Sequence, residues 1–250
     1  MNIEYLGLCE NGLVRKVNQD AVLLKINEYA GLFVVADGMG GHSNGEIASK
    51  MIIQSMEMWW NQFSEEKYQC DFKQMICSIQ SSLEEVNKVI FHTYNQGSVC
   101  GSTLLVLLLY KNRYAVIHAG DCRAYLLKSD FRCITVDDVW ENQPGLRAED
   151  RNNKAHPNYG HLTNALGIFE KLKVSIQAGQ LCQDMLFLLC SDGLYKMCDE
   201  KKIEDSMQHI LNNDSMQLKA RELKDVVYAN GARDNISMVM VKLNGMRSNH

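Results

Sequence analysis

Two short apolar stretches of this chain end in the same pair of residues, an aspartate followed by a glycine. Residues 34–38 read VVADG and residues 188–193 read LLCSDG. Asp-Gly pairs are common in hairpin turns, but a hairpin needs a second strand directly after the turn. Sequence with helical character follows both of these pairs instead. Asp37 and Asp192 are therefore candidates for chemistry at the ends of buried strands.

Three more aspartates lie at the edges of apolar stretches. Asp234 comes directly before the last apolar stretch, Asp121 lies in a predicted glycine turn, and Asp20 precedes another apolar segment. Carboxylates gathered at strand ends would repel one another unless cations lay between them. Oxygen-only ligand sets suit Mg²⁺ or Mn²⁺ rather than zinc. Spacing alone leaves open whether the five carboxylates converge.

The elements that must position these aspartates follow from hydrophobic periodicity. Predicted strands cover residues 32–36, 103–110, 113–118, 123–127, 131–136, 172–176, 185–190 and 236–241. Predicted helices cover about 43–63, which begins with a Ser43/Glu46 capping box, and 71–95, 200–211 and 215–228. Tight turns between the strands of 103–136 predict an antiparallel meander. Strands and helices occur in blocks, which indicates an α+β fold with helices outside antiparallel sheets.

Composition limits the classes of function. The chain has 250 residues, 46% of them hydrophobic, and we expect one domain over residues 1–244 with a short tail over 245–250. A net charge of -4 and a pI near 6.0 give no general affinity for nucleic acid or anionic membranes. Without a secretory pattern or a bilayer-spanning apolar stretch, a cytoplasmic protein is expected, and we take it to be a monomer. The nine cysteines, an odd number without C-x-x-C pairs, are interpreted as small hydrophobes.

Seven short motifs occur in one order along most of the chain. They are Arg15-x-x-Asn18-Gln19-Asp20, Val34-Val-Ala-Asp37-Gly-Met-Gly-Gly41, Gly101-Ser102-Thr103, His118-Ala-Gly-Asp121-Cys-Arg123-Ala-Tyr-Leu, Leu162-Thr163-x-Ala-Leu-Gly167, Ser191-Asp192-Gly-Leu194 and Asp234-Asn235. Each motif is weak alone. The ordered set resembles the metal-dependent type 2C (PPM) protein serine/threonine phosphatases, in particular their compact bacterial members.

The resemblance implies a four-layer α+β sandwich, in which two antiparallel β-sheets pack face to face with helices on the outside. It also implies a centre of two Mn²⁺ or Mg²⁺ ions at one end of the sandwich. In that family the aspartate matching Asp37 bridges both ions, and the backbone carbonyl matching Gly38 ligates one of them. The residues matching Asp192 and Asp234 ligate the other ion.

The same resemblance assigns three further positions. Asp20 matches a residue that holds metal-bound water, and Asp121 matches one associated with a third, weaker ion. Arg15 matches the arginine that binds the substrate phosphate. Its planar guanidinium can pair with two phosphate oxygens, a geometry that lysine cannot copy. Arg15 and Asp37 are the residues expected to be catalytic.

The implied reaction is hydrolysis of phosphoserine and phosphothreonine in proteins by a metal-activated water. Phosphate monoesters react extremely slowly in water, and two divalent ions can supply both a nucleophile and charge neutralisation. The expected substrates are phosphorylated proteins that a Ser/Thr kinase modifies. Two alternatives stay open: a catalytically inactive sensor or scaffold with the same fold, and a phosphatase of a small phosphorylated metabolite or a different phosphorylated regulator.

Some residues depart from the family pattern. Met39 stands where some relatives carry a histidine proposed as general acid, and Cys122 replaces a usual serine, a change that we expect to be tolerated. The segment 140–162 differs most from the flap that overlies the site in relatives. His42 and His118 are interpreted as structural polar residues rather than general acids. The glycine run of the second motif lacks the Gly-Lys-Ser/Thr of a P-loop.

Overall fold

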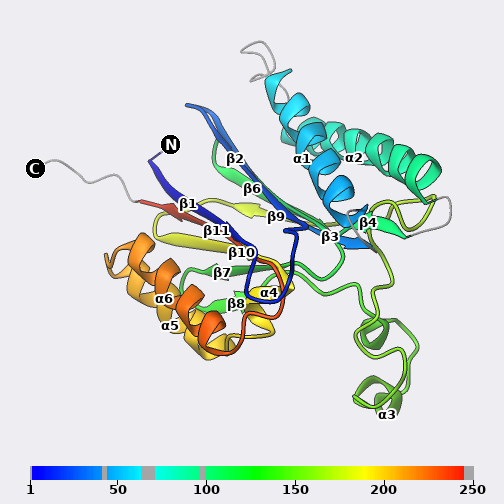
Figure 1. The fold of residues 1–250 in the computed structure, drawn as a ribbon. Helices are drawn as coiled ribbons and strands as arrows, with labels where there is room; N and C mark the ends of the chain where they lie inside the picture. The colour runs from blue at the N-terminus through cyan, green and yellow to red at the C-terminus, as the bar shows by residue number, and fades with distance from the viewer. Residues whose placement is uncertain (1, 41–43, 63–70, 96–98, 245–250) are drawn as a thin grey trace, which may run out of the picture.

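The computed structural model describes residues 2–40, 44–62, 71–95 and 99–244. Its strands form two antiparallel sheets (Figure 1). The five-stranded sheet has the order β1 (Ile3–Glu10), β11 (Ile236–Leu243), β10 (Met185–Cys190), β7 (Arg123–Leu127) and β8 (Phe131–Cys133). The six-stranded sheet has the order β2 (Asp20–Ile26), β3 (Ala30–Gly40), β5 (Leu104–Tyr110), β6 (Arg113–Ala119) and β9 (Ser175–Gln180), and β4 (Cys100–Ser102) pairs with β3.

Helices cover the outer face of each sheet. They are α1 (Asn44–Asn61) and α2 (Phe72–Tyr94) on the six-stranded sheet, and α5 (Glu200–Leu211) and α6 (Met216–Ala229) on the five-stranded sheet (Figure 1). In β3, Leu32 and Val34 pack beneath α1 and α2, whereas Phe33 and Val35 pack toward the other sheet. Successive side chains of a strand point to opposite faces, so a strand buried on both faces is apolar throughout. The predicted four-layer α+β sandwich is confirmed.

Strand β10 has the same two-sided burial. Leu186 and Leu188 pack with α5 and α6, and Phe187 and Leu189 join the central core that also contains Phe33 and the rest of the inner face of β3. Strands β3 and β10 thus face each other across the space between the sheets. Because each strand leads into an Asp-Gly pair, the fold brings the two pairs to the same region.

The predicted helices match those observed where the chain is described. Helices α2, α5 and α6 begin and end within about one residue of the prediction. Helix α1 ends at Asn61, and its first described residue is Asn44. The predicted cap residue Ser43 and the predicted last residue Phe63 lie outside the described residues, as does His42.

Two predictions about the strands are wrong. β3 does not end before Asp37 but continues to Gly40, because its last residues pair with β4, Gly38 lying opposite Ser102. The strands of 103–136 do not form one meander, since β6 belongs to one sheet and β7 to the other. The chain crosses between the sheets at Gly120, whose φ of +107° is a conformation that favours glycine.

Other strands differ in extent or are absent from the prediction. β9 covers Ser175–Gln180 rather than 172–176, and β8 ends at Cys133. The periodicity did not reveal β1, β2 or β4 as strands. β1 and β2 lie at sheet edges and are only partly buried, so their hydrophobic pattern is weak.

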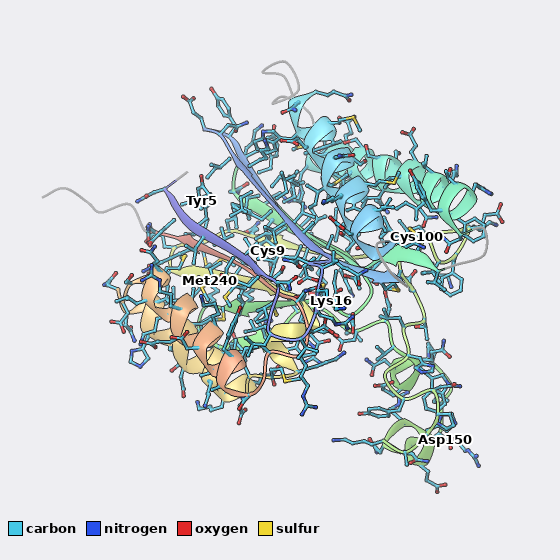
Figure 2. The ribbon with its side chains drawn as sticks, in the orientation of Figure 1. Tyr5, Cys9, Lys16, Cys100, Asp150 and Met240 are labelled. Atoms are coloured by element: carbon cyan, nitrogen blue, oxygen red, sulfur yellow. The ribbon has the colours of Figure 1, made fainter. Side chains whose placement is uncertain are left out.

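The irregular segment 140–162 projects from one end of the sandwich (Figure 1). It contains two short helices, η2 (Trp140–Asn142) and α3 (Ala148–Arg151). Asp150 marks its far end in Figure 2. The Trp140 indole stacks on the His156 imidazole with ring centroids 3.9 Å apart, and this contact joins the start of the segment to a residue near its end.

The eight cysteines of the described residues are all free thiols. Four of them are fully buried, in agreement with their interpretation as small hydrophobes: Cys100, Cys122, Cys190 and Cys198. Cys77 and Cys133 are exposed. Within the described part of the chain, no helix combines the length and the apolar character needed to cross a membrane.

Candidate metal centre

A cavity of about 710 Å³ opens where β3, β10 and β11 reach the same end of the sandwich. Six of the seven residues predicted to form the site line it: Arg15, Asp37, Gly38, Asp121, Asp192 and Asp234. The seventh, Asp20, is buried beside Asp37, so the structure brings together all the predicted residues. Residues 160–162, at the end of the segment that was expected to differ from the family flap, also line the cavity, as does Lys196, which the sequence did not assign to the site.

Asp37 is held in place by its backbone. Its N–H donates to the Thr103 hydroxyl (3.0 Å), and its carbonyl accepts from the Thr103 N–H (2.8 Å) and the Ser102 hydroxyl (3.0 Å). In the β2–β3 pair Asp37 lies directly opposite Asp20, so both carboxylates leave the same face of the sheet. Burial raises the pKa of Asp37 well above its usual range, and the charge of Asp20 raises it further.

Asp20 is almost completely buried, and its carboxylate is tied to β10. The Ser191 hydroxyl donates to Asp20 Oδ2 at 2.7 Å and accepts from the Ser237 N–H at 3.0 Å. Burial raises the pKa of Asp20 to about 6, the Ser191 hydrogen bond opposes this shift, and the charge of Asp192 adds to it. Ser191 thus fixes the end of one sheet against the first aspartate of the other.

The short helix α4 (Asp192–Tyr195) brings Lys196 to two of the aspartates. Lys196 Nζ lies 2.5 Å from Asp192 Oδ2 and 3.6 Å from Asp121 Oδ2. The Tyr195 hydroxyl donates to the Asp121 carbonyl at 3.0 Å. Burial raises the pKa of Asp121 to about 6, the charge of Asp192 contributes to the rise, and Lys196 opposes it. The i, i+4 spacing of Asp192 and Lys196 is the sequence signal that could have identified this pair.

Arg15 lies on a loop that is fastened to the start of β11. Its Nη2 lies 2.7 Å from Asp234 Oδ2, and both side chains are partly exposed. Lys16, labelled in Figure 2, marks the position of this loop. The buried Asn235 accepts the Gln19 N–H at 2.8 Å and donates to the carbonyls of Asn11 (2.9 Å) and Val17 (3.2 Å).

The glycines of both Asp-Gly pairs are required by close backbone approach. A Cβ on Gly38 would lie 2.1 Å from the Gly45 carbonyl oxygen, and a Cβ on Gly193 would lie 1.9 Å from the Asn235 carbonyl oxygen. Neither contact is possible for a side chain. These glycines therefore let the strand ends pass close to neighbouring backbone while presenting the preceding aspartates to the cavity.

The donor set fits divalent cations that prefer oxygen. Burial and then the charges of the other four aspartates of the site all raise the pKa of Asp37, so the five carboxylates lie within electrostatic reach of one another. Among the described residues, no three His, Cys, Asp or Glu side chains lie in a cluster that could hold a metal ion as they stand. Three of the aspartates are paired with side-chain cations: Arg15 contacts Asp234, and Lys196 contacts Asp121 and Asp192. When all five carboxylates are ionised, they exceed these two cations by three negative charges. The chemistry of the site is that of Mg²⁺ or Mn²⁺.

A second group of contacts links Asp121, through Tyr195, to an ion pair between Arg123 and Asp137. Arg123 forms a forked ion pair with Asp137, with N–O distances of 2.8 to 3.2 Å, and its guanidinium lies 3.9 Å from the centre of the Tyr195 ring. Tyr195 in turn contacts Asp121. Buried His118 contacts the Val136 carbonyl at 2.9 Å, in agreement with its interpretation as a structural residue.

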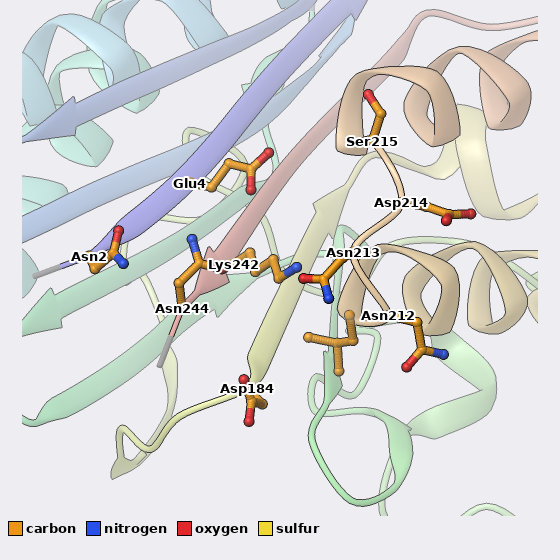
Figure 3. A pocket seen from close by; sticks show the side chains of 10 residues that line it. Asn2, Glu4, Asp184, Asn212, Asn213, Asp214, Ser215, Lys242 and Asn244 are labelled. Atoms are coloured by element: carbon orange, nitrogen blue, oxygen red, sulfur yellow. The ribbon is translucent and has the colours of Figure 1, made fainter. Parts of the chain in front are cut away.

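A larger cavity of about 1020 Å³ contains none of the predicted site residues (Figure 3). It is lined by Asp184, which precedes β10, whereas Asp192 follows β10, so the two cavities lie at opposite ends of this strand. Lys242 reaches toward the α5–α6 connection and donates to the Ile210 carbonyl at 2.7 Å. Size alone therefore does not identify the chemical site.

Fold and site together define the class: a two-sheet sandwich with outer helices and an aspartate-lined cavity at one end, as in the metal-dependent phosphatases. Residues 14–227 match the family described as Protein phosphatase 2C, and the chain belongs to that family. The expected class of enzyme, a protein serine/threonine phosphatase and thus a phosphoric monoester hydrolase, is confirmed by this membership.

Relatives match nearly the whole chain. The serine/threonine phosphatase stp of Listeria welshimeri is 27% identical over 247 residues, which cover 95% of both proteins. The structure of PppA, described as a key regulatory component of T6SS in Pseudomonas aeruginosa, has 30% identity and a TM-score of 0.79 and covers 96% of this chain and 97% of its own. The catalytic domain of the serine/threonine protein phosphatase PstP, solved in complex with two manganese ions, has 25% identity and a TM-score of 0.77, with coverage of 97% and 99%.

Proposed function

We propose that this chain hydrolyses phosphoserine and phosphothreonine in proteins with two Mn²⁺ or Mg²⁺ ions held by the aspartates of the 710 Å³ cavity. The observation that carries the proposal is the meeting of five aspartates and Arg15 at one end of the sandwich, with negative charge in excess. The manganese ions in the related PstP catalytic domain support the choice of metal.

The residues have separate roles in the proposed centre. Asp37, the Gly38 carbonyl, Asp192 and Asp234 would together hold the two ions, since all four residues line the cavity. Asp20 would hold water beside Asp37, and Asp121, which the family resemblance associates with a third, weaker ion, contacts the Lys196 ammonium here. When bound, the two ions activate water and withdraw charge from the phosphoryl oxygens.

Arg15 binds the substrate phosphate. Its side chain is about half exposed and lines the cavity, so it can rotate without disturbing the core. Its present partner, Asp234, is a proposed metal ligand, and loading the centre would leave the guanidinium available for two phosphate oxygens. Met39 also lines the cavity, and its thioether has no proton to give the leaving group.

The wider context of the enzyme is also proposed. Residues 1–244 act as one phosphatase domain, whereas the short tail expected over 245–250 lies outside the described residues. The substrates are phosphoproteins that a Ser/Thr kinase modifies in the cytoplasm, and the enzyme takes part in signalling by reversing that modification. It works as a monomer, without nucleic acid or membrane partners.

Phosphate release from a phosphothreonine peptide, measured with Mn²⁺ and with EDTA, tests the proposal. Release is expected only with the metal, and Asp37→Asn should abolish it by removing charge from the centre. Asp130→Asn, a change at an exposed turn between β7 and β8, is the matched control and should keep full activity. A folded wild-type protein that binds Mn²⁺ but releases no phosphate from the peptide would instead be a sensor or scaffold, or a phosphatase of a different phosphorylated molecule, and a panel of other phosphorylated substrates separates these two.

A further inference from the structure

Lys196 places a positive charge between two of the five aspartates. Its ammonium lies 2.5 Å from Asp192 Oδ2 and 3.6 Å from Asp121 Oδ2, on the wall of the cavity. Because α4 makes one turn between positions 192 and 196, the side chain returns over the carboxylate at the start of the helix.

The backbone around Lys196 is fixed. Its N–H donates to the Asp192 carbonyl at 3.0 Å, and the Met197 carbonyl accepts from the Asn230 side chain at 2.7 Å. Tyr195, the preceding residue, contacts Asp121 through its hydroxyl. The lysine is thus anchored beside both carboxylates, and only its side chain has freedom to move.

We propose that the Lys196 ammonium is a built-in cation that occupies the space between Asp121 and Asp192 and keeps an additional divalent ion out of it. A third divalent ion there would need Asp121 Oδ2 and Asp192 Oδ2, the oxygens that the ammonium contacts, at about 2.1 Å for Mg²⁺, whereas the second ion of the proposed centre can use the other carboxylate oxygen of Asp192. The third ion would also meet a like charge only a few ångströms away. This inference rests on the two-ion centre proposed above.

The charge balance of the cavity agrees with this assignment. The five aspartates exceed Arg15 and Lys196 by three negative charges, and two divalent ions would leave one positive charge in excess. That excess has the sign that attracts a phosphate dianion. A third divalent ion is not needed for the balance while Lys196 is present, but the site loses one positive charge when the lysine is replaced.

Mn²⁺ titration of the metal-free protein, followed by calorimetry and by the electron paramagnetic resonance signal of free Mn²⁺, tests the proposal without an activity assay. The wild type should bind two equivalents. Lys196→Met, which keeps the unbranched side chain except for its terminal ammonium, should bind a third equivalent. Lys196→Arg should bind two. A unit charge about 4 Å from a bound ion changes the affinity for that ion by more than about tenfold, even near a protein surface. Lys196→Met should therefore bind the third Mn²⁺ at least about tenfold more tightly than the wild type binds any third Mn²⁺.

Three further variants separate the outcomes. Lys201→Met removes the same charge from an exposed lysine on α5 that pairs with Glu204 and Asp205, and should leave two equivalents. Combining Lys196→Met with Asp121→Asn should remove the third equivalent, whereas Lys196→Met with Asp130→Asn should keep it. Two equivalents for both the wild type and Lys196→Met, with unchanged circular dichroism, would overturn the role of Lys196. Fewer than two for the wild type would instead overturn the two-ion centre.

Discussion

Asn235→Ala tests how the loop that carries Arg15 is held. The Asn235 side chain makes three hydrogen bonds, one to the buried Gln19 N–H and two to the carbonyls of Asn11 and Val17, which are nearer to solvent. Loss of the acceptor for a buried N–H costs about 1–3 kcal/mol, and each bond to a partly exposed group about 0.5–1.5 kcal/mol. We expect the free energy of unfolding to fall by about 3 kcal/mol.

Thermal unfolding followed by circular dichroism, in EDTA, measures this effect. For a chain of this size about 3 kcal/mol corresponds to a fall in Tm of about 6–12 °C. Asn230→Ala is the matched control, because the side chain of this exposed asparagine donates one hydrogen bond, to the Met197 carbonyl, and its loss should cost less than about 1.5 kcal/mol. Equal Tm values for the two variants would refute the account of the Asn235 contacts.

Three further predictions concern the backbone, the buried charge and the phosphate ligand. Gly193→Ala places a Cβ 1.9 Å from the Asn235 carbonyl oxygen, so the yield of soluble protein should fall sharply, with a loss of about 3 kcal/mol or more if the variant can be purified. The pKa of Asp20 is raised to about 6, so the folded metal-free protein binds a proton that the unfolded chain releases near pH 4. The free energy of unfolding of the wild type should therefore fall by on the order of 2 kcal/mol as pH rises from about 4 through 6 in EDTA. Asp20→Asn should show a smaller fall, and equal falls for the two proteins would contradict the raised pKa of Asp20. Arg15→Lys should lower kcat/KM on a phosphothreonine peptide about 10- to 100-fold, through loss of the forked contact, while Mn²⁺ affinity changes little; an unchanged kcat/KM would remove Arg15 from phosphate binding.

Sequence periodicity predicted the elements that are buried most regularly. Strands β5 and β10 and helices α5 and α6 were located because each buries either both faces or one continuous stripe, and burial leaves a repeat in the sequence. The edge strands β1 and β2 carry a weaker repeat because they are partly exposed. The step from β6 to β7 looks like a hairpin locally, and only the packing of two sheets separates them.

The aspartates of the site, by contrast, were located by residue type and order. Asp37 and Asp192 attracted notice because each follows an apolar stretch in an Asp-Gly pair that is not followed by the second strand of a hairpin. Lys196 did not, because an i, i+4 Asp–Lys pair is ordinary on an exposed helix surface. Its significance depends on Asp121, which is distant in sequence but lies 3.6 Å away in the structure.

The sequence by itself determined the chemistry available to this protein: five aspartates, an arginine, and glycines beside two of the aspartates. The tertiary structure decided how that chemistry is arranged. The β2–β3 register sets Asp20 opposite Asp37, and α4 sets Lys196 between Asp121 and Asp192. Charge–charge energies and desolvation depend on distance and burial, which the order of residues does not specify. The raised pKa values of the buried aspartates and the ion pairs of Arg15 and Lys196 therefore follow from the fold.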